Sequence, residues 1–376
     1  MTDKTQRRIG IGIIGGGYMG KAHSVAMNAV AAVFDTSLRP SLEMLCTTTA
    51  VGAADKARQF GFARATADWR TLVNDPKVEA VIIASPQHTH CEIALAAFAA
   101  GKPVFCEKPL GVSLAESRVM VAAAAKSHCA NMTGFNYIRT PASQLAREIV
   151  AAGEIGEMTY FRGEHTEDFL ADPALPPTWR TKAAANGSIG DLAPHIINAA
   201  HALAGPFDEL IADIATVHKT RPSPSGSEPV TNDDHANIMC RFQSGCMGAL
   251  YVSRIATGRK MGYIYEIFGA KGAIRFDQED QNALWLYKGD AKPDRQGFTK
   301  ILTGPLHKDY QPFCLGPGHG TGYQDQIIIE ARDFLEAIAT GKNIWPTFHD
   351  GMLVNQVIEA ARLSHAERRW VKVSEV

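Results

Sequence analysis

The stretch "IGIGIIGGGYMGKAHS", Ile9 to Ser24, determines how the first third of the chain folds. Its apolar beginning is typical of a buried parallel strand, and the residues after the glycines are typical of a helix. Between them, Gly15, Gly17 and Gly20 fit the spacing G-x-G-x-x-G. The first glycine permits a tight turn, the second lets the backbone approach a pyrophosphate, and the third lets helix and strand pack closely. This pattern predicts a dinucleotide-binding turn, with a purely structural turn as the alternative.

Strand-like and helix-like segments alternate through the rest of the first third of the chain. The later strand-like segments lie at residues 43–49, 78–85, 103–109 and 129–137. Strands that alternate with helices predict a doubly wound parallel sheet with helices on both faces, the Rossmann fold. We therefore predict a dinucleotide-binding α/β domain at residues 1–137.

The pattern changes after about residue 137. Extended segments there are joined by short turns such as "QSG" and "GAKG", which indicate antiparallel meanders. Residues 221–234 are expected to form a flexible excursion, and the Gly- and Pro-rich residues 292–322 a long loop. We predict that residues 138–376 form a second, α+β domain.

The length and composition of the chain set limits on its class. Its 376 residues exceed what one hydrophobic core usually supports, which predicts two domains. The formal charge of −1 gives no bulk field for nucleic acid or an acidic membrane. No run approaches the ~18 apolar residues of a membrane helix, and the N-terminus has no apolar signal core. The seven cysteines form no C-x-x-C pair, so we expect a cytoplasmic protein with reduced thiols and no nucleic-acid or membrane partner.

The residues at the expected adenosine ribose site depart from the usual pattern. An acidic residue about 20 positions after the glycines would bind the ribose and repel a phosphate. The sequence instead has Thr47, Thr48 and Thr49. Their hydroxyls can bind a ribose or a phosphate, and no arginine follows immediately as a cationic clamp. The cofactor is therefore NAD or NADP, with NAD favoured, unless these threonines are simply strand residues.

Polar residues also follow the strand at residues 78–85. Ligands of doubly wound sheets bind beyond the carboxyl ends of the strands, so Ser85, Gln87 and His90 are expected to contact the cofactor. Helix capping is the alternative role for this loop. The pair His88 and His90 does not predict a metal site, because no third ligand is evident nearby.

The segment "FCEKPL" places Lys108 at the end of another strand, directly after Glu107. A lysine held there by a neighbouring carboxylate can place its ammonium group at a reacting oxygen. The alternative is an exposed surface lysine without a chemical role.

The segment "NGSIGDLAPHIINAAHAL" contains a candidate acid–base pair. Asp191 is expected at the N-cap of a helix that begins near Leu192, and His195 follows near the same face. The positive end of the helix disfavours an imidazolium, whereas an adjacent carboxylate favours it. This balance suits His195 to general acid–base work. The alternative is a capping aspartate followed by a buried structural histidine.

Together these motifs resemble those of the glucose–fructose oxidoreductase / inositol dehydrogenase / rhizopine-catabolism (Gfo/Idh/MocA) family. The matching segments, in the family's order, are "GGGYMGKAH", "SPQHTHCEIA", "CEKPL", "GFNYIRTP", "EIGEMTYFRG", "WR" and "GDLAPHIIN". The resemblance implies that residues 138–376 bind substrate and mediate oligomerisation through a large, mostly antiparallel open sheet. It implies NAD(P)-dependent hydride transfer to or from a secondary hydroxyl or ketone of a sugar, anhydrosugar, glycoside or cyclitol. The segments "FNYIRTPA" and "GTGYQDQIIIEARDFLEAI" look like those of members that act on anhydrosugars and glycosides.

The resemblance also implies roles for individual residues. The implied catalytic set is Lys108, Asp191 and His195. The implied cofactor-binding residues are Gly15, Gly17, Tyr18, Met19, Gly20, Thr47, Ser85, Gln87, His90, Glu107, Lys108, Asn136, Trp179 and Arg180. The implied substrate-binding residues are Lys108, Asn136, Arg139, Asp191, His195 and Tyr323, and no metal is expected.

One departure from the family pattern leaves the substrate open. Asn198 stands where family members commonly have Asp after "H-x-x". The alternative functions are an inositol dehydrogenase, an anhydrofructose-type reductase, or a non-catalytic sensor that binds cofactor and sugar. The resemblance further implies a homodimer or homotetramer.

Overall fold

The computed structural model describes residues 7–224 and 226–376, and the chain divides into two compact units. The first unit runs to Arg139 and also contains Gly322–Leu353. The second consists of Thr140–Thr321 and Val354–Val376. The predicted division at residue 137 lies two residues from the first boundary. It placed residues 322–353 in the second domain, whereas the structure groups them with the first, because the chain returns to the Rossmann unit after the second sheet.

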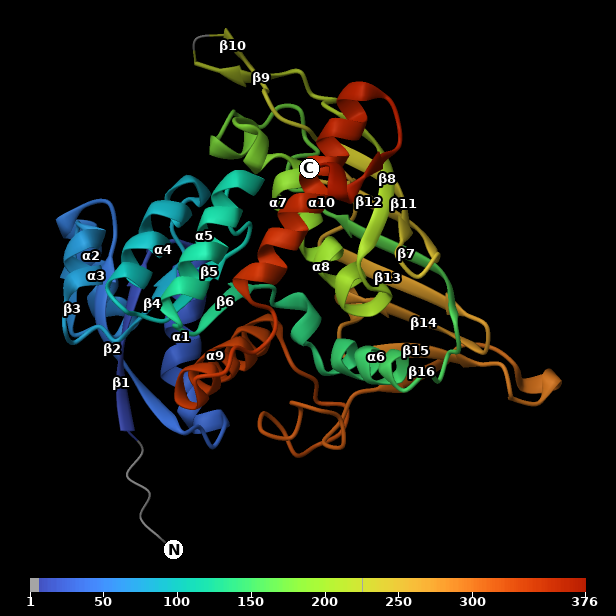
Figure 1. Ribbon diagram of the computed structural model, residues 1–376, viewed down its shortest axis with the longest axis horizontal. Coiled ribbons are helices and arrows are strands. Elements are labelled where there is room, and N and C mark those ends of the chain that lie inside the picture. The colour runs from blue at the N-terminus through green and yellow to red at the C-terminus, as the bar shows by residue number, and fades with distance from the viewer. Residues whose placement is uncertain (1–6, 225) are drawn as a thin grey trace, which may run out of the picture. The chain divides into compact units, whose positions relative to one another are not determined.

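The first unit contains a six-stranded parallel sheet with the strand order β3-β2-β1-β4-β5-β6 (Figure 1). Its strands are β1 (Arg7–Ile14), β2 (Leu38–Cys46), β3 (Arg64–Thr66), β4 (Ala80–Ile83), β5 (Val104–Glu107) and β6 (Asn131–Gly134). Its helices are α1 (Tyr18–Val33), α2 (Ala50–Phe60), α3 (Trp69–Asn74), α4 (His90–Ala99), α5 (Leu114–Ser127) and α9 (Tyr323–Thr340). The predicted Rossmann fold is confirmed. The three-residue strand β3 and the single turn-and-a-half of α3 were not predicted, because they are too short for a periodic signal.

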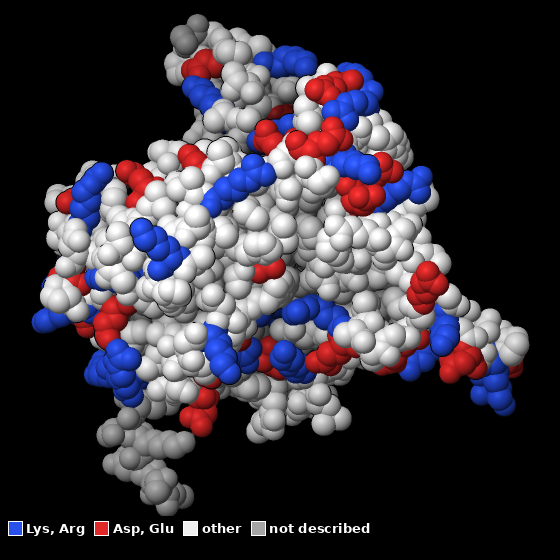
Figure 2. Space-filling view, in the orientation of Figure 1, with Lys and Arg blue, Asp and Glu red and all other residues white. Residues whose placement is uncertain are grey.

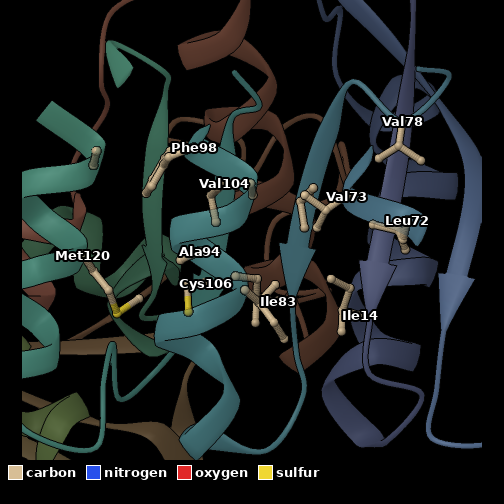
Figure 3. Packing of buried hydrophobic residues seen from close by; sticks show 14 of the residues in the cluster. Ile14, Leu72, Val73, Val78, Ile83, Ala94, Phe98, Val104, Cys106 and Met120 are labelled. Atoms are coloured by element: carbon tan, nitrogen blue, oxygen red, sulfur yellow. The ribbon is translucent and has the colours of Figure 1, made fainter. Parts of the chain in front are cut away.

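Both faces of this sheet are buried, as the side chains that point alternately to one face and the other along β5 demonstrate. Cys106 belongs to an apolar cluster with residues of α4 and α5, such as Ala94 and Met120 (Figure 3). The neighbouring Phe105 points to the opposite face, where its ring lies 5.8 Å from that of Phe334 in α9. Burial on both faces stabilises the sheet by about 25 cal/mol per Å² of apolar surface. It also fixes the carboxyl ends of β1, β4 and β5, where the predicted cofactor residues lie.

The second unit is built on a nine-stranded sheet with the order β16-β15-β14-β13-β7-β12-β11-β8-β17. Its strands are β7 (Met158–Thr166), β8 (Phe207–Ala215), β11 (His235–Phe242), β12 (Met247–Ser253), β13 (Gly262–Gly269), β14 (Gly272–Asp277), β15 (Ala283–Lys288), β16 (Thr299–Leu302) and β17 (Val371–Lys372). Neighbouring strands are antiparallel except for the parallel pair β7 and β12. The predicted large, mostly antiparallel sheet is confirmed.

Helices of the second unit include α6 (Pro141–Ala151), α7 (Ser188–Asp191) and α8 (Ala193–Ala204), and α10 (Phe348–Glu367) ends in it. Helix α8 lies directly on β7 because Gly163 has no side chain. A Cβ at Gly163 would lie 2.6 Å from Ile196 Cγ1. This close packing sets the position of His195, the residue before Ile196.

Two segments that were expected to be irregular contain strands. Residues 221–234 were expected to be a flexible excursion, but β9 (Thr220–Ser223) and β10 (Gly226–Pro229) form an antiparallel pair there. Residues 292–322 were expected to be one long loop, but β16 extends the large sheet by pairing with β15. Because both segments are rich in proline and glycine, which are uncommon in strands, their composition did not predict these strands.

The described residues include no helix that is both long and apolar enough to span a membrane. On the face shown in Figure 2, lysines and arginines lie interspersed with aspartates and glutamates. This mixture agrees with the formal charge of −1 for the whole chain.

Candidate active site

The glycine loop between β1 and α1 has the geometry that its spacing predicted. Gly15 has φ +115°, and a Cβ there would lie 2.2 Å from the Ala84 carbonyl oxygen. A Cβ at Gly20 would lie 1.9 Å from the Gly15 carbonyl oxygen. At Gly17, the N-cap of α1, a Cβ would meet no atom within 4 Å, and the first turn of α1 has no acidic residue. The open backbone at a positive helix end fits a pyrophosphate.

Aromatic and sulfur side chains cluster beside this loop. The ring of Tyr18 lies 5.8 Å from that of Tyr323, whose hydroxyl donates to Met19 Sδ at 3.3 Å. The ring of Tyr137 lies 6.1 Å from that of Tyr323. Burial raises the pKa of Tyr323, so this residue stays a neutral phenol. The cluster brings together Tyr18, Met19 and Tyr323, which sequence analysis assigned separately to cofactor and substrate.

The ribose end of the predicted cofactor site contains a cation that sequence analysis missed. Lys56, in α2, donates a hydrogen bond from Nζ to the Gly16 carbonyl oxygen. The Thr47 hydroxyl donates to Thr49 O at 3.2 Å, and the Thr49 hydroxyl caps α2 by accepting from Gly52 N. The expectation that this site lacks a cationic group was based only on the absence of an arginine immediately after the threonines. Lysine side chains on a helix lean toward its N-terminus, which lets Lys56 reach the loop from the second turn of α2.

His90 is buried and takes a structural position. Its Nδ1 lies 3.0 Å from Pro109 O and its Nε2 lies 3.0 Å from Ser85 O, so the ring connects the ends of β4 and β5. Burial lowers the pKa of His90, which favours the neutral imidazole. Gln87 begins the short helix η1 (Gln87–Thr89) between these ends. Among the described residues, no three His, Cys, Asp or Glu side chains are grouped in a way that could hold a metal.

Glu107 joins the end of β5 to helix α1. Its Oε1 lies 2.7 Å from His23 Nε2, and its Oε2 accepts the backbone N–H of Lys108 at 3.3 Å. Glu107 is buried, whereas Lys108 is partly exposed. The sequence motifs predicted no role for His23, which lies in α1. The residues around His23 give no sign of a partner 84 positions away in the sequence.

Two predicted substrate-binding residues are buried and paired inside the first unit. Asn136 Nδ2 donates to Gln326 Oε1 at 2.9 Å. Arg139 pairs with Asp333 and donates from Nη2 to Trp345 O at 2.7 Å. These contacts favour a structural role in which both residues hold α9 to the Rossmann unit.

In the second unit, Asp191 pairs with Arg180. Arg180 Nη1 donates to Asp191 Oδ2 at 2.5 Å, and the guanidinium lies over the rings of Trp179 and Phe169 at 4.4 Å and 5.2 Å. Asp191 is the last residue of α7, and Leu192 occupies the N-cap of α8 without a side-chain cap. The expected capping role for Asp191 is therefore wrong, because a separate short helix precedes α8. Pro194 lies in the first turn of α8, where a proline removes no intrahelical hydrogen bond.

A buried aspartate fixes the start of α7. Asp233 Oδ2 accepts from Ser188 Oγ at 2.5 Å and from Ile189 N at 2.8 Å. Gly187 permits this contact, since a Cβ there would lie 2.1 Å from Asp233 Oδ1. This cap sets the orientation of α7 and thus of Asp191 at its end.

His195 is buried in the first turn of α8 and lies beside a second histidine. The ring centroids of His195 and His165 are 5.4 Å apart. His165 contacts Leu192 O and Glu167 Oε1 with its two ring nitrogens, at 2.8 Å and 3.2 Å. Sequence analysis missed His165 and Glu167, although the polar segment "EHTE" at the end of an otherwise alternating strand was a usable signal. Asn198, one turn after His195, is also buried.

Comparisons with known proteins agree with this architecture. Residues 9–135 match the family described as oxidoreductases with an NAD-binding Rossmann fold, and residues 143–275 match the GFO/IDH/MocA C-terminal domain. Levoglucosan dehydrogenase from Pseudarthrobacter phenanthrenivorans is 38% identical over 98% of this chain and 99% of its own. Myo-inositol 2-dehydrogenase from Thermotoga maritima is 28% identical over 97% of this chain and 99% of its own.

Solved structures also match this chain over almost its whole length. Levoglucosan dehydrogenase in complex with NADH and levoglucosan matches with a TM-score of 0.95 and 39% identity, over 98% of this chain and 100% of that one. An NAD-binding oxidoreductase from Klebsiella pneumoniae matches with a TM-score of 0.93 and 38% identity, over 97% of this chain and 99% of that one. The chain therefore belongs to the Gfo/Idh/MocA family of oxidoreductases, and its first part is an NAD-binding Rossmann fold.

Proposed function

We propose that this protein is an NAD-dependent dehydrogenase that oxidises a secondary hydroxyl of a sugar, anhydrosugar, glycoside or cyclitol, with levoglucosan as the first candidate. The observation that carries this proposal is the 38% identity to levoglucosan dehydrogenase over 98% of the chain. The family match alone establishes an oxidoreductase, and the whole-length similarity supports the choice of substrate class. The 28% identity to a myo-inositol 2-dehydrogenase keeps cyclitols among the candidates.

The residues of the first unit fit the cofactor. Gly17 leaves its backbone open at the N-terminus of α1, where the N–H groups can hold the pyrophosphate. Thr47 and Lys56 provide hydroxyl and ammonium donors for the adenosine ribose. When bound there, NAD⁺ supplies the acceptor for the hydride of the carbinol carbon.

The proposed roles of the catalytic set follow from the chemistry of the three groups. His195 removes the hydroxyl proton as a general base. Asp191, fixed by Arg180 and by the short helix α7, orients that proton transfer. Lys108 stabilises the negative charge that develops on the oxygen before the ketone forms. The backbone of Lys108 is held at the end of β5, where its N–H donates to the buried Glu107 carboxylate at 3.3 Å.

The assembly and the compartment are part of the proposal. We expect a homodimer or homotetramer that forms through the open face of the large sheet, where Met239 and Met247 are 56% and 47% exposed. Exposed apolar side chains on one sheet face are typical of an interaction surface. All seven cysteines are free thiols, which suits the reducing cytoplasm. Light scattering of the eluting protein measures the assembly, and a monomer would contradict this part.

The experiment that tests the function is a substrate screen. NAD⁺ and NADP⁺ are each mixed with levoglucosan, 1,5-anhydrosugars, glucosides and inositols, and the absorbance of the reduced cofactor is followed. We expect turnover with NAD⁺ and at least one of these compounds. Binding of NADH without turnover on any compound would favour the alternative, a sensor that binds cofactor and sugar.

A further inference from the structure

A buried arginine, Arg254, directly follows β12 and has no part in the roles proposed above. It is 1% exposed. Strands β11 and β12 pair antiparallel with His235 opposite Ser253. The next residues outward, Asp234 and Arg254, therefore meet at the end of the ladder, where the Arg254 backbone N–H donates to Asp234 O at 3.0 Å. A guanidinium buried this deeply needs oxygen acceptors for its N–H groups.

Each nitrogen of the Arg254 guanidinium donates to an oxygen. Nε donates to Asp234 Oδ1 at 3.1 Å, and Nη2 donates to Asn232 Oδ1 at 2.7 Å. Nη1 donates to two backbone carbonyl oxygens, that of Arg180 at 2.6 Å and that of Asn186 at 3.1 Å. The buried carboxylate of Asp234 pairs the positive charge, which offsets the cost of removing that charge from water. These contacts fix the orientation of the guanidinium.

Asn232 holds the same backbone carbonyl as Arg254. Its Nδ2 donates to Arg180 O at 2.9 Å and to Ala183 O at 3.0 Å. The Arg180 carbonyl oxygen thus accepts hydrogen bonds from two buried side chains, which occupies both of its lone pairs. The backbone of the short helix η3 (Trp179–Thr181) is therefore anchored to the start of β11 and the end of β12.

The other partner of the Arg180–Asp191 ion pair is held by the same segment of the chain. Asp233, the residue after Asn232, caps the start of α7, and Asp191 is the last residue of that helix. Adjacent residues thus hold both sides of the ion pair. Replacing a buried ion pair such as Arg254 and Asp234 by apolar groups is often neutral for stability. The expected effect of these contacts therefore lies in the geometry that they impose.

We propose that Asn232 and Arg254 are positioning residues that act on the reaction through Arg180. They hold the Arg180 carbonyl, and so they fix the backbone from which its side chain reaches Asp191. This inference rests on the proposed function, in which Asp191 orients the proton transfer to His195. A displacement of about 1 Å in such a group can lower a rate about a hundredfold.

Hydrogen exchange of the substrate-free protein, followed by mass spectrometry, tests the anchoring. We expect the amides of residues 178–187 to exchange about tenfold faster or more in Asn232→Ala and in Arg254→Lys, whereas β13 keeps its wild-type rate. Arg254→Lys keeps the charge beside Asp234 but not the planar fork of donors. The matched control is Thr216→Val, which removes only the hydrogen bond from Thr216 Oγ1 to Asn232 O at 3.0 Å. It should leave residues 178–187 unchanged.

A double-mutant cycle tests whether the anchoring acts through Arg180. The substrate is a compound that the wild-type protein oxidises, and kcat/KM is measured in each variant. We expect Asn232→Ala to lower kcat/KM by about tenfold in the wild-type background and by less than about twofold in Arg180→Met. A merely structural role would lower kcat/KM by the same factor in both backgrounds, because loss of folded protein does not depend on residue 180.

Two results would overturn the proposal: unchanged exchange of residues 178–187 in the folded variants, or equal factors of loss in the two backgrounds. Asn232→Ala leaves the ion pair of Arg254 and Asp234 intact, so it decides the matter if Arg254→Lys does not fold. Failure of the proposed function is a different result, the absence of turnover in the wild-type protein. In that case the exchange measurement, which needs no substrate, decides whether the anchoring exists.

Discussion

Arg180 Nη1 lies 2.5 Å from Asp191 Oδ2, and this ion pair joins the short helix η3 to the end of α7. The two residues were predicted from different motifs and for different partners, one for the cofactor and one for the substrate. Under the proposed function, this contact predicts that Arg180 acts on the reaction through Asp191. The guanidinium of Arg180 lies over the ring faces of Trp179 and Phe169, and these contacts restrict its orientation.

Replacing Arg180 tests this role. We expect Arg180→Met to lower kcat/KM by about 10- to 100-fold, because a hydrogen bond to a charged group contributes about 1.5–3 kcal/mol. The affinity for NADH, measured by fluorescence titration, is expected to change much less. Arg180→Lys is the matched control, because it keeps the charge but not the planar guanidinium. Its kcat/KM should lie between those of wild type and Arg180→Met. Equal loss of NADH affinity and of kcat/KM would show that Arg180 acts on the cofactor instead.

The catalytic set is tested by removing its members one at a time. Lys108→Ala and His195→Ala are each expected to abolish turnover while NADH still binds, because neither side chain belongs to the glycine loop. Steady-state rates and NADH fluorescence measure the two properties separately. Near-normal rates in both variants across the substrate panel would contradict the assigned roles.

The ribose site is tested through Thr47, which directly follows β2. A carboxylate there would repel a 2′-phosphate, so Thr47→Asp should weaken NADPH binding by about tenfold or more relative to NADH binding. Thr47→Ser, which keeps the hydroxyl, serves as the control. Fluorescence titration with both reduced cofactors gives the ratio. An unchanged ratio in Thr47→Asp would mean that the ribose does not lie beside Thr47.

The buried carboxyl of Glu330 predicts a dependence of stability on pH. Burial, together with the nearby Glu107 carboxylate, raises the pKa of Glu330 well above its usual range, and Arg139 opposes this effect. The folded unit therefore holds the proton more tightly than the unfolded chain. This stabilisation is full below the ordinary glutamate pKa of about 4.3 and is lost as pH rises through the raised value.

Glu330→Gln removes this titration while keeping the shape of the side chain. We expect the thermal midpoint of Glu330→Gln, relative to wild type, to increase as the pH rises from acidic to alkaline. Glu336→Gln, on the same helix α9 and nearer to solvent, is the matched control. A difference between Glu330→Gln and wild type that stays constant with pH would show that the pKa of Glu330 is not raised in the folded protein. Calorimetry over a series of pH values makes the measurement.

Local patterns predicted the elements whose signal lies within one segment. The strand predicted at residues 78–85 contains β4 (Ala80–Ile83), and a Cβ at Gly15 or at Gly20 would clash with a backbone oxygen, as their predicted roles require. These features depend on sterics and periodicity over a few residues, which the sequence displays directly.

The remaining features depend on partners that are distant in the sequence. Arg139 and Asn136 were predicted to bind substrate, but they are buried against residues of α9 about 190 positions later. The pair His23 and Glu107 is separated by 84 positions. No local pattern reveals such partners, because they meet only when α9 returns to the Rossmann unit and the parallel strands align their ends.

The measurement that tests the central claim most directly is the formation of NADH when the purified protein is mixed with NAD⁺ and levoglucosan. The proposed function predicts that NADH absorbance rises with protein concentration and that His195→Ala abolishes the rise. Tight NADH binding with no reduced cofactor from levoglucosan, or from any other sugar, glycoside or cyclitol tested, would contradict it.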